Sequence, residues 1–259
     1  MHYENVVVEK GNDFVATITL NRPQNMNTFN TPLATELNSA LLELDADREV
    51  RVIILKGNGK VFSAGIDVSD FFGMDVMAYR EWIECMERPL VTMNSLKKPV
   101  IAQIHGVAVA NGAGIVAAAD LAIAAENARI GLTAINVGLN CIGPVVPVVR
   151  SIGRKRALEM LFYGDLYPAP EALKMGLINR VVPEADLEKT TRAWAAVLAQ
   201  KSPIALQIAK KAFYAAEDMD YKTAFEYMNE AFPRLCSTKD AAEGIRAFME
   251  KRTPEWKEQ

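Results

Sequence analysis

Two short segments rich in small residues could polarise a carbonyl group. They are Phe62-Ser63-Ala64-Gly65-Ile66-Asp67 and the stretch His105–Gly114, and each follows an apolar, β-branched run. The second segment leads into an apolar stretch that is expected to be helical. A loop that enters a helix leaves backbone N–H groups unpaired, and small residues allow another group to approach them closely. Two such loops facing each other predict an oxyanion hole, which stabilises a carbonyl oxygen that becomes negative.

The elements that must position these loops alternate between strands and helices. Short apolar runs predict strands at residues 6–8, 15–20, 52–56, 100–104 and 121–124. Leucines at every third or fourth position predict a helix over Pro32–Leu44, with Thr31 as its N-cap. Such alternation of strands and helices predicts an α/β fold.

The pattern becomes helical from about Asp186 onward. Helices are expected from Pro203, over Asp220–Leu235 and over Lys239–Arg252. The chain therefore divides into an α/β core, residues 1–195, and a C-terminal helical region, residues 196–259, which packs on the core. The stretch Phe71–Arg88 is rich in aromatic residues and methionine, and it predicts either a core helix or a pocket lining.

The composition excludes several classes of function. The chain has 259 residues and a formal net charge of −3, so neither nucleic acid nor a membrane is an expected partner. Its three cysteines are widely spaced, which favours a reducing compartment and gives no metal-ligand pattern. The N-terminus reads as mature sequence rather than a signal peptide, so the expected location is cytoplasmic.

The ordered set of motifs resembles the crotonase (enoyl-CoA hydratase/isomerase) superfamily over nearly the whole chain. The resemblance rests on the two small-residue segments and on further segments at 20–23, 25–28, 52–57, 98–102, 120–124, 172–178 and 244–252. It implies a spiral of ββα units with a C-terminal helical oligomerisation region, assembled as a homotrimer or homohexamer. It also implies an acyl-CoA thioester as substrate, with no separate cofactor and no metal.

The resemblance also assigns roles to individual residues. The backbone N–H groups of Ala64 and Asn111 would hold the thioester oxygen, although the family usually has glycine at the position of Asn111. Asp67 is expected to shape its turn through backbone hydrogen bonds. The full set of residues expected at the substrate or its CoA moiety is Arg22, Ala64, Gly65, Ile66, Asp67, Gly112, Phe248 and Lys251.

The carboxylates that the family's hydratases and isomerases use are missing. The resemblance places them at positions 114, 134 and 142, where this chain has Gly114, Ala134 and Ile142. Hydration of an enoyl thioester requires a base for water and an acid for the α-carbon. Classical hydration is therefore doubtful.

Three alternatives remain open from the sequence. An acid/base group could come from elsewhere, with Asp70, Glu81, Glu84, Tyr227 and, at low rank, Cys141 as candidates. The reaction could be decarboxylation of a malonyl-type CoA thioester, because loss of CO₂ itself generates the enolate. The protein could also bind an acyl-CoA without turning it over.

Overall fold

The computed structural model describes residues 3–258, apart from the side chain of Asp70. A main sheet has the strand order β1-β2-β3-β4-β6-β9, and a smaller sheet has the order β5-β7-β8. The strands are β1 (Val6–Lys10), β2 (Val15–Leu20), β3 (Val52–Gly57), β4 (Val100–Ile104), β5 (Val107–Val109), β6 (Leu121–Ala125), β7 (Arg129–Gly131), β8 (Tyr167–Pro168) and β9 (Arg180–Val182).

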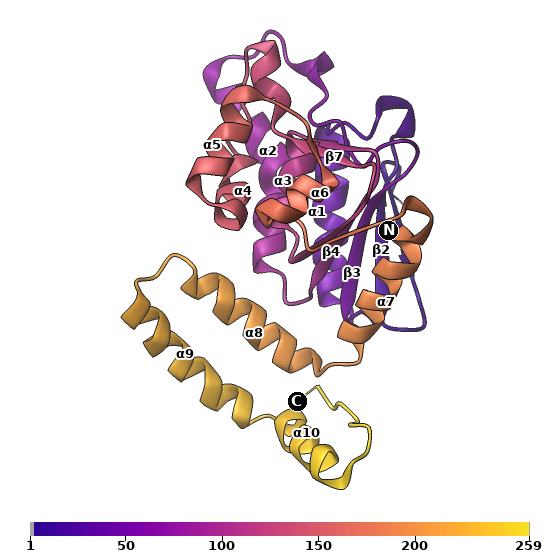
Figure 1. The fold of residues 1–259 in the computed structure, drawn as a ribbon, viewed down its shortest axis with the longest axis vertical. Coiled ribbons are helices and arrows are strands. Elements are labelled where there is room, and N and C mark those ends of the chain that lie inside the picture. The colour runs from indigo at the N-terminus through magenta and orange to yellow at the C-terminus, as the bar shows by residue number, and fades with distance from the viewer. Residues whose placement is uncertain (1–2, 259) are drawn as a thin grey trace.

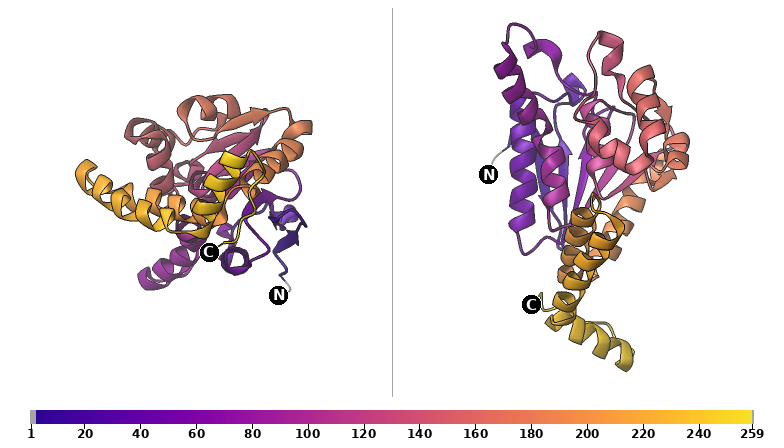
Figure 2. Two further views of the ribbon diagram at one scale, coloured as in Figure 1. Left: turned by 90° about the horizontal axis from the view of Figure 1, so that it is seen from below. Right: turned by 90° about the vertical axis from the view of Figure 1, so that its left-hand side faces the viewer.

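The helices are α1 (Thr31–Ala46), α2 (Val76–Ser95), α3 (Asn111–Ala118), α4 (Val145–Ile152), α5 (Arg154–Tyr163), α6 (Ala169–Met175), α7 (Leu187–Ala199), α8 (Pro203–Ala216), α9 (Tyr221–Cys236) and α10 (Lys239–Glu250). The long helices α1 and α2 lie on one side of the main sheet, and the group α4–α6 lies on the other (Figures 1 and 2). Helix α3 packs between α2 and α4. The predicted α/β fold is confirmed.

The register of β3 and β4 explains how two distant loops meet. Apart from the antiparallel pair β1–β2, the paired strands of the main sheet are parallel. Ile53 of β3 aligns with Val100 of β4, so the two strands end at the same edge of the sheet. Both are buried along most of their length, as the continuous apolar runs of a parallel sheet require. The loops that follow them, 58–67 and 105–110, therefore leave the sheet side by side.

Helix α1 begins one residue earlier than the leucine pattern predicts. Its N-cap is Asn30, whose side-chain oxygen accepts a hydrogen bond of 3.0 Å from the backbone N–H of Leu33. The prediction of Thr31 as the cap is therefore wrong by one residue. Asparagine and threonine both serve as N-caps, so residue type alone did not separate them.

The helical extension leaves the core later than predicted. Helix α7 packs on β2, β3, β4 and β6 along its length, so the predicted boundary at residue 195 falls inside a core helix. Helices α8, α9 and α10 form the part that projects from the core in Figure 1. The helices predicted from Pro203 onward are confirmed. Among the described residues no helix is long and apolar enough to cross a bilayer.

A half-buried carboxylate links this extension to the core. Asp120, at the start of β6, accepts a hydrogen bond of 2.7 Å from Lys210 Nζ and one of 2.9 Å from Tyr214 Oη. Both donors lie on α8. Asp120 also accepts the backbone N–H of Val100 at 2.7 Å, so one side chain joins β4 and α8.

Candidate functional site

The two small-residue loops pack directly on each other. Ser63 donates its backbone N–H to Val107 at 3.1 Å, and Val109 donates to Ser63 at 3.0 Å. A Cβ atom at Gly112 would lie only 2.7 Å from the Ser63 carbonyl oxygen. The predicted facing of the two loops is confirmed, and glycine at 112 permits it.

Gly65 is required by the same close approach. Its φ of +95° lies in the region that side chains disfavour, and an added Cβ would lie 2.9 Å from the Cβ of Ala110. Any other residue here would strain the turn and separate the loops.

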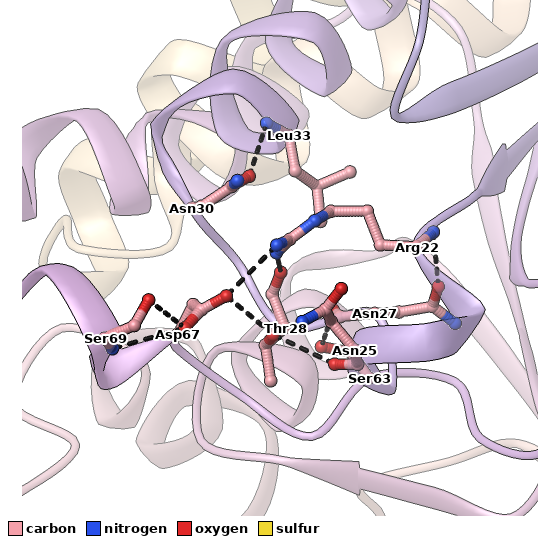
Figure 3. Close-up of polar contacts among 9 residues, drawn as sticks. All are labelled: Arg22, Asn25, Asn27, Thr28, Asn30, Leu33, Ser63, Asp67 and Ser69. Carbon is pink, nitrogen blue, oxygen red and sulfur yellow. Dashed lines mark hydrogen bonds and ion pairs between the residues drawn. The ribbon is translucent and has the colours of Figure 1, made fainter.

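A buried asparagine, Asn27, fixes the first loop through hydrogen bonds to its backbone carbonyl groups. Asn27 is fully buried and donates through Nδ2 to the carbonyl oxygens of Asn58, Val61 and Phe62 at 2.8, 3.0 and 3.2 Å. Its backbone carbonyl accepts the hydroxyl of Ser63 at 2.8 Å (Figure 3). The segment 25–28 thus sets the path of the loop.

Arg22 and Asp67 also brace this loop. The Arg22 guanidinium lies 3.1 Å from Asp67 Oδ2 and donates to the carbonyl of Thr28 (Figure 3). Asp67 Oδ1 accepts the backbone N–H and the hydroxyl of Ser69, and these bonds hold the pKa of Asp67 below its usual value. Asp67 therefore shapes its turn as predicted. The resemblance predicts that Arg22 contacts the substrate or its CoA moiety, but here its guanidinium is already paired with Asp67.

The unpaired N–H groups differ from the predicted pair at one position. The N–H of Ala64 donates to the Met26 carbonyl at 3.0 Å, so this donor is already engaged. In the described part of the chain, the N–H groups of Ile66 and Asn111 have no acceptor. Both residues line the same cavity. The structure contradicts Ala64 as a donor and points to Ile66, two residues further along the same loop.

The side chain of Asn111 ties the second loop to helix α2. Its Nδ2 donates to the Met86 carbonyl at 3.0 Å, which fixes the orientation of the amide. Its Oδ1 is buried and has no partner among the described residues. The preceding residue, Ala110, has φ 48° and ψ −115°, a conformation that costs about 1–3 kcal/mol for a non-glycine residue. This strain is located at the turn that leads into the unpaired N–H.

The cavity beside these N–H groups has a volume of about 650 Å³ and mostly apolar walls. Its apolar lining comes from the first loop, α2 and the segment 133–144: Ile66, Val68, Phe71, Val76, Trp82, Ile83, Val137, Leu139, Ile142 and Pro144. The aromatic stretch at 71–88 therefore serves both predicted roles, because α2 packs on the core through Met86 and lines the cavity through Trp82 and Ile83.

A carboxylate that was not among the predicted site residues, that of Glu87, lines the cavity. Glu87 on α2 is half-buried, and burial raises the pKa of its carboxyl, with the Gly143 backbone N–H partly offsetting that effect. No basic side chain of the described residues forms an ion pair with it. The sequence places Glu87 one helical turn after Ile83, but α2 carries other acidic residues, and only the packing singles out Glu87.

Three of the other acid/base candidates, Glu81, Glu84 and Tyr227, do not line the cavity. Glu81 and Glu84 are exposed, and Glu84 pairs with Arg80 at 3.1 Å. Tyr227 lies on α9, in the projecting extension. The side chain of Asp70 lies outside the described residues.

Cys141 does line the cavity, but as a neutral thiol. It is 3% exposed, and burial raises the pKa of the thiol above its usual value. The thiolate is the nucleophilic form of cysteine. At neutral pH Cys141 is therefore an apolar wall residue, which argues against its low-ranked role as a catalyst.

Position 114 is filled by its neighbours. A Cβ atom at Gly114 would lie 2.7 Å from Leu90 Cδ2 and 3.0 Å from Pro144 Cβ. A larger side chain there would require the end of Leu90 to move and Pro144 to shift slightly. Ala134 and Ile142, the other two positions that the resemblance singles out, both line the cavity with apolar side chains.

Phe248 and Lys251 lie far from this cavity in the same chain. Phe248 lies in the last turn of α10, and Lys251 is the C-cap of this helix. Neither residue lines the cavity, and α10 lies at the far end of the extension, away from α2 (Figure 1). Phe248 is 85% exposed. Among the described residues no cluster of His, Cys, Asp and Glu is arranged to hold a metal ion.

Comparison with known proteins identifies similar chains over almost the full length. The family model for enoyl-CoA hydratase/isomerase matches residues 10–259. A short-chain-enoyl-CoA hydratase of Clostridium acetobutylicum is 33% identical over 97% of both chains. A mitochondrial enoyl-CoA hydratase domain-containing protein 3 of Rattus norvegicus is 34% identical over 94% of this chain and 82% of its own length.

Solved structures are equally similar. The crystal structure of an enoyl-CoA hydratase from Mycobacterium smegmatis superposes with a TM-score of 0.94 at 34% identity, covering 98% of this chain and 99% of that one. The human enoyl Coenzyme A hydratase domain-containing protein 3 gives a TM-score of 0.93 at 32% identity, covering 98% and 100%. These matches confirm the crotonase fold that the sequence motifs indicate.

Proposed function

This chain belongs to the enoyl-CoA hydratase/isomerase family, and on that premise we propose that it binds an acyl-CoA thioester and stabilises the enolate of that thioester. The thioester oxygen accepts the N–H groups of Ile66 and Asn111. The acyl chain lies in the apolar cavity beside them. The chemistry uses no cofactor other than the CoA of the substrate.

The observation that carries this proposal is the pair of unpaired N–H groups that line one apolar cavity. Where one such donor has been removed from an enzyme, the rate has fallen by about 10²–10³-fold. An apolar wall strengthens the effect, because electrostatic interactions are larger where water is excluded.

The cavity favours an apolar acyl group over a malonyl-type one. Its walls are largely hydrocarbon and aromatic, and the Glu87 carboxyl lies among them. A second carboxylate on the substrate would meet an ionised Glu87 as a like charge, and the Arg80 guanidinium that also lines the cavity is already paired with Glu84. Proton transfer at the α-carbon is therefore the preferred reaction class, ahead of decarboxylation and of binding without turnover.

The exposed end of the extension supports assembly into a homotrimer or homohexamer. Large apolar side chains are exposed along α9 and α10: Phe225, Phe232, Ile245, Phe248 and Met249. Such patches mark interaction surfaces. In an assembly Phe248 and Lys251 would approach the ligand of a neighbouring copy. The three cysteines are free, which supports a reducing compartment such as the cytoplasm.

The test uses a panel of CoA thioesters, including crotonyl-CoA and methylmalonyl-CoA, with binding measured by calorimetry and products by mass spectrometry. We expect binding and conversion of unsaturated thioesters without loss of CO₂. Loss of CO₂ from methylmalonyl-CoA would replace proton transfer by decarboxylation. Absence of binding across the panel would refute the proposal.

A pair of variants isolates the N–H of Asn111. Asn111 is the first residue of α3, a position that tolerates proline. Asn111→Pro removes both the N–H and the side-chain amide, whereas Asn111→Ala removes the amide alone. We expect Asn111→Pro to be slower than Asn111→Ala by about 10²-fold. Equal rates would show that this N–H does not contact the thioester.

A further inference from the structure

We propose that Glu87 of helix α2 is the group that moves the proton at the α-carbon of the thioester. This inference rests on the proposed function, and it assigns the acid/base role to a helix that carries none of the positions singled out by the resemblance. Glu87 lines the cavity together with Ile66 and Asn111. It is the one carboxylate of the described residues among the side chains that line this cavity.

A direct link holds Glu87 in place relative to the oxyanion donors. The Asn111 side chain donates to the carbonyl of Met86, the residue directly before Glu87. One hydrogen bond of 3.0 Å therefore connects the loop that carries the unpaired N–H to the helical turn that carries the carboxylate. Asn111 acts as a positioning residue for Glu87 as well as through its own N–H.

The neighbouring loop is shaped to admit a carboxylate from α2. A Cβ atom at Gly143 would overlap the Glu87 carboxyl oxygens, so the glycine leaves room for the carboxyl in its present position, and a larger residue would displace it. In the same loop Pro144 closes the space beside Gly114, together with Leu90 of α2. Helix and loop thus crowd position 114 and accommodate a carboxylate from position 87.

The surroundings keep this carboxyl able to gain and lose a proton. It has no ion pair in the described part of the chain. The charged side chains that line its two cavities are already paired: Arg80 with Glu84, Arg150 with Glu217 and Asp218, and Asp120 with Lys210. Burial raises its pKa, which brings an acid closer to neutral pH. General acid/base groups are most effective when their pKa lies near the working pH.

Glu87 also lines a second cavity, through which its carboxyl can exchange a proton with water. That cavity has a volume of about 510 Å³ and lies between α2, α4 and α8. It includes polar side chains such as Asn94 and Arg150 and is large enough for water. The carboxyl can therefore exchange its proton with solvent on the side away from the acyl chain.

The proton-transfer step balances without any further reactant. The Glu87 carboxylate takes a proton from the α-carbon, and the C–H electron pair becomes part of the enolate. The negative charge moves to the thioester oxygen, where the Ile66 and Asn111 N–H groups stabilise it. The neutral Glu87 acid then returns the proton to the α-carbon, or to the γ-carbon of an unsaturated chain.

The experiment follows exchange of the α-hydrogens of but-3-enoyl-CoA with D₂O, by mass spectrometry, on the full chain. We expect Glu87→Gln to lower the exchange rate by about 10²-fold or more. Its affinity for but-3-enoyl-CoA is expected to stay within about threefold, since it keeps the shape of the side chain. Glu84→Gln, one turn earlier on the exposed side of α2, is the matched control and is expected to exchange at the wild-type rate.

Gly143→Ala tests the geometry without changing Glu87 chemically. The new methyl group displaces the carboxyl, and we expect a loss of about tenfold in exchange. In the Glu87→Gln background Gly143→Ala is expected to have little further effect, because the group it displaces no longer transfers the proton.

The outcomes separate the two proposals. Exchange by Glu87→Gln at a rate within a few-fold of wild type, with but-3-enoyl-CoA still bound, would overturn the role of Glu87 and leave the proposed function standing. A wild-type protein that neither binds but-3-enoyl-CoA nor exchanges its hydrogens would overturn both. The pH profile gives a separate check: the wild-type exchange rate falls as acid protonates Glu87, and this limb disappears in Glu87→Gln.

Discussion

Replacing Gly114 by alanine tests whether position 114, where the family resemblance predicts a carboxylate, is closed to larger side chains in this protein. Gly114 lies inside helix α3, where alanine normally stabilises a helix by about 0.5–1 kcal/mol relative to glycine. Here the new Cβ would lie 2.7 Å from Leu90 Cδ2 and 3.1 Å from Pro144 Cα. Leu90 can move its side-chain end, but the backbone of Pro144 cannot yield easily. We therefore expect Gly114→Ala to lower the free energy of unfolding instead of raising it.

The expected size follows from the costs of overpacking. Extra methylenes in a packed core cost about 1–3 kcal/mol. After the helical gain of alanine, the net loss of stability for Gly114→Ala is about 1 kcal/mol. Gly114→Glu adds a buried carboxylate without a partner, so its loss is expected to be larger by several-fold, at roughly 3 kcal/mol or more.

Gly244→Ala is the matched control, because Gly244 also lies inside a helix but has space. An added Cβ there would meet the Trp256 ring at 3.4 Å, an ordinary contact distance. Urea unfolding at one fixed protein concentration should give a gap of about 2 kcal/mol between the two alanine variants. In a Leu90→Ala background the cost of Gly114→Ala should shrink. Equal stabilisation by both alanines would refute the claim that Leu90 and Pro144 fill the position.

Three further predictions concern groups outside that position. Lys210→Met leaves the half-buried Asp120 carboxylate without its cation and should lower the free energy of unfolding by about 3 kcal/mol, measured by urea unfolding. Because burial raises the pKa of Glu87 in the folded state, Glu87→Gln should be more stable than wild type at pH 7, and thermal scans should show the difference vanish below the unfolded-state pKa, near pH 4. Cys141 should react with iodoacetamide far more slowly than the exposed Cys236, as followed by peptide mass spectrometry.

The fold was predictable from the sequence because its strongest signals are long and redundant. The parallel strands are continuous apolar runs, and the leucine spacing of α1 shows one buried face. The facing of the two loops followed from their position after two such strands. The exact N-cap of α1 could not be predicted, because it depends on a single hydrogen bond. The end of the core could not be predicted either, because it depends on which strands α7 packs against.

The site was less predictable, for a physical reason. Which N–H of the first loop is unpaired depends on a hydrogen bond from Ala64 to Met26, residues far apart in the sequence. No residue type signals that bond, so the choice between Ala64 and Ile66 required coordinates. Glu87 was overlooked because its helix carries several acidic residues, and only tertiary packing distinguishes the half-buried one from its exposed neighbours.

The arrangement suggests why the carboxylate can change position while the oxyanion donors cannot. The donors are backbone groups, and their positions are fixed by the ends of β3 and β4. Gly65 and Gly112 allow the two loops to pack closely, since a side chain at either position would clash with the facing loop. A proton carrier needs only to reach one face of the α-carbon, and a side chain from any wall of the cavity can do so. In this protein Gly143 leaves space for the Glu87 carboxyl, whereas Leu90 and Pro144 crowd position 114. Glycine at 114 is therefore compatible with the proposed proton transfer, provided that helix α2 supplies a carboxylate at 87.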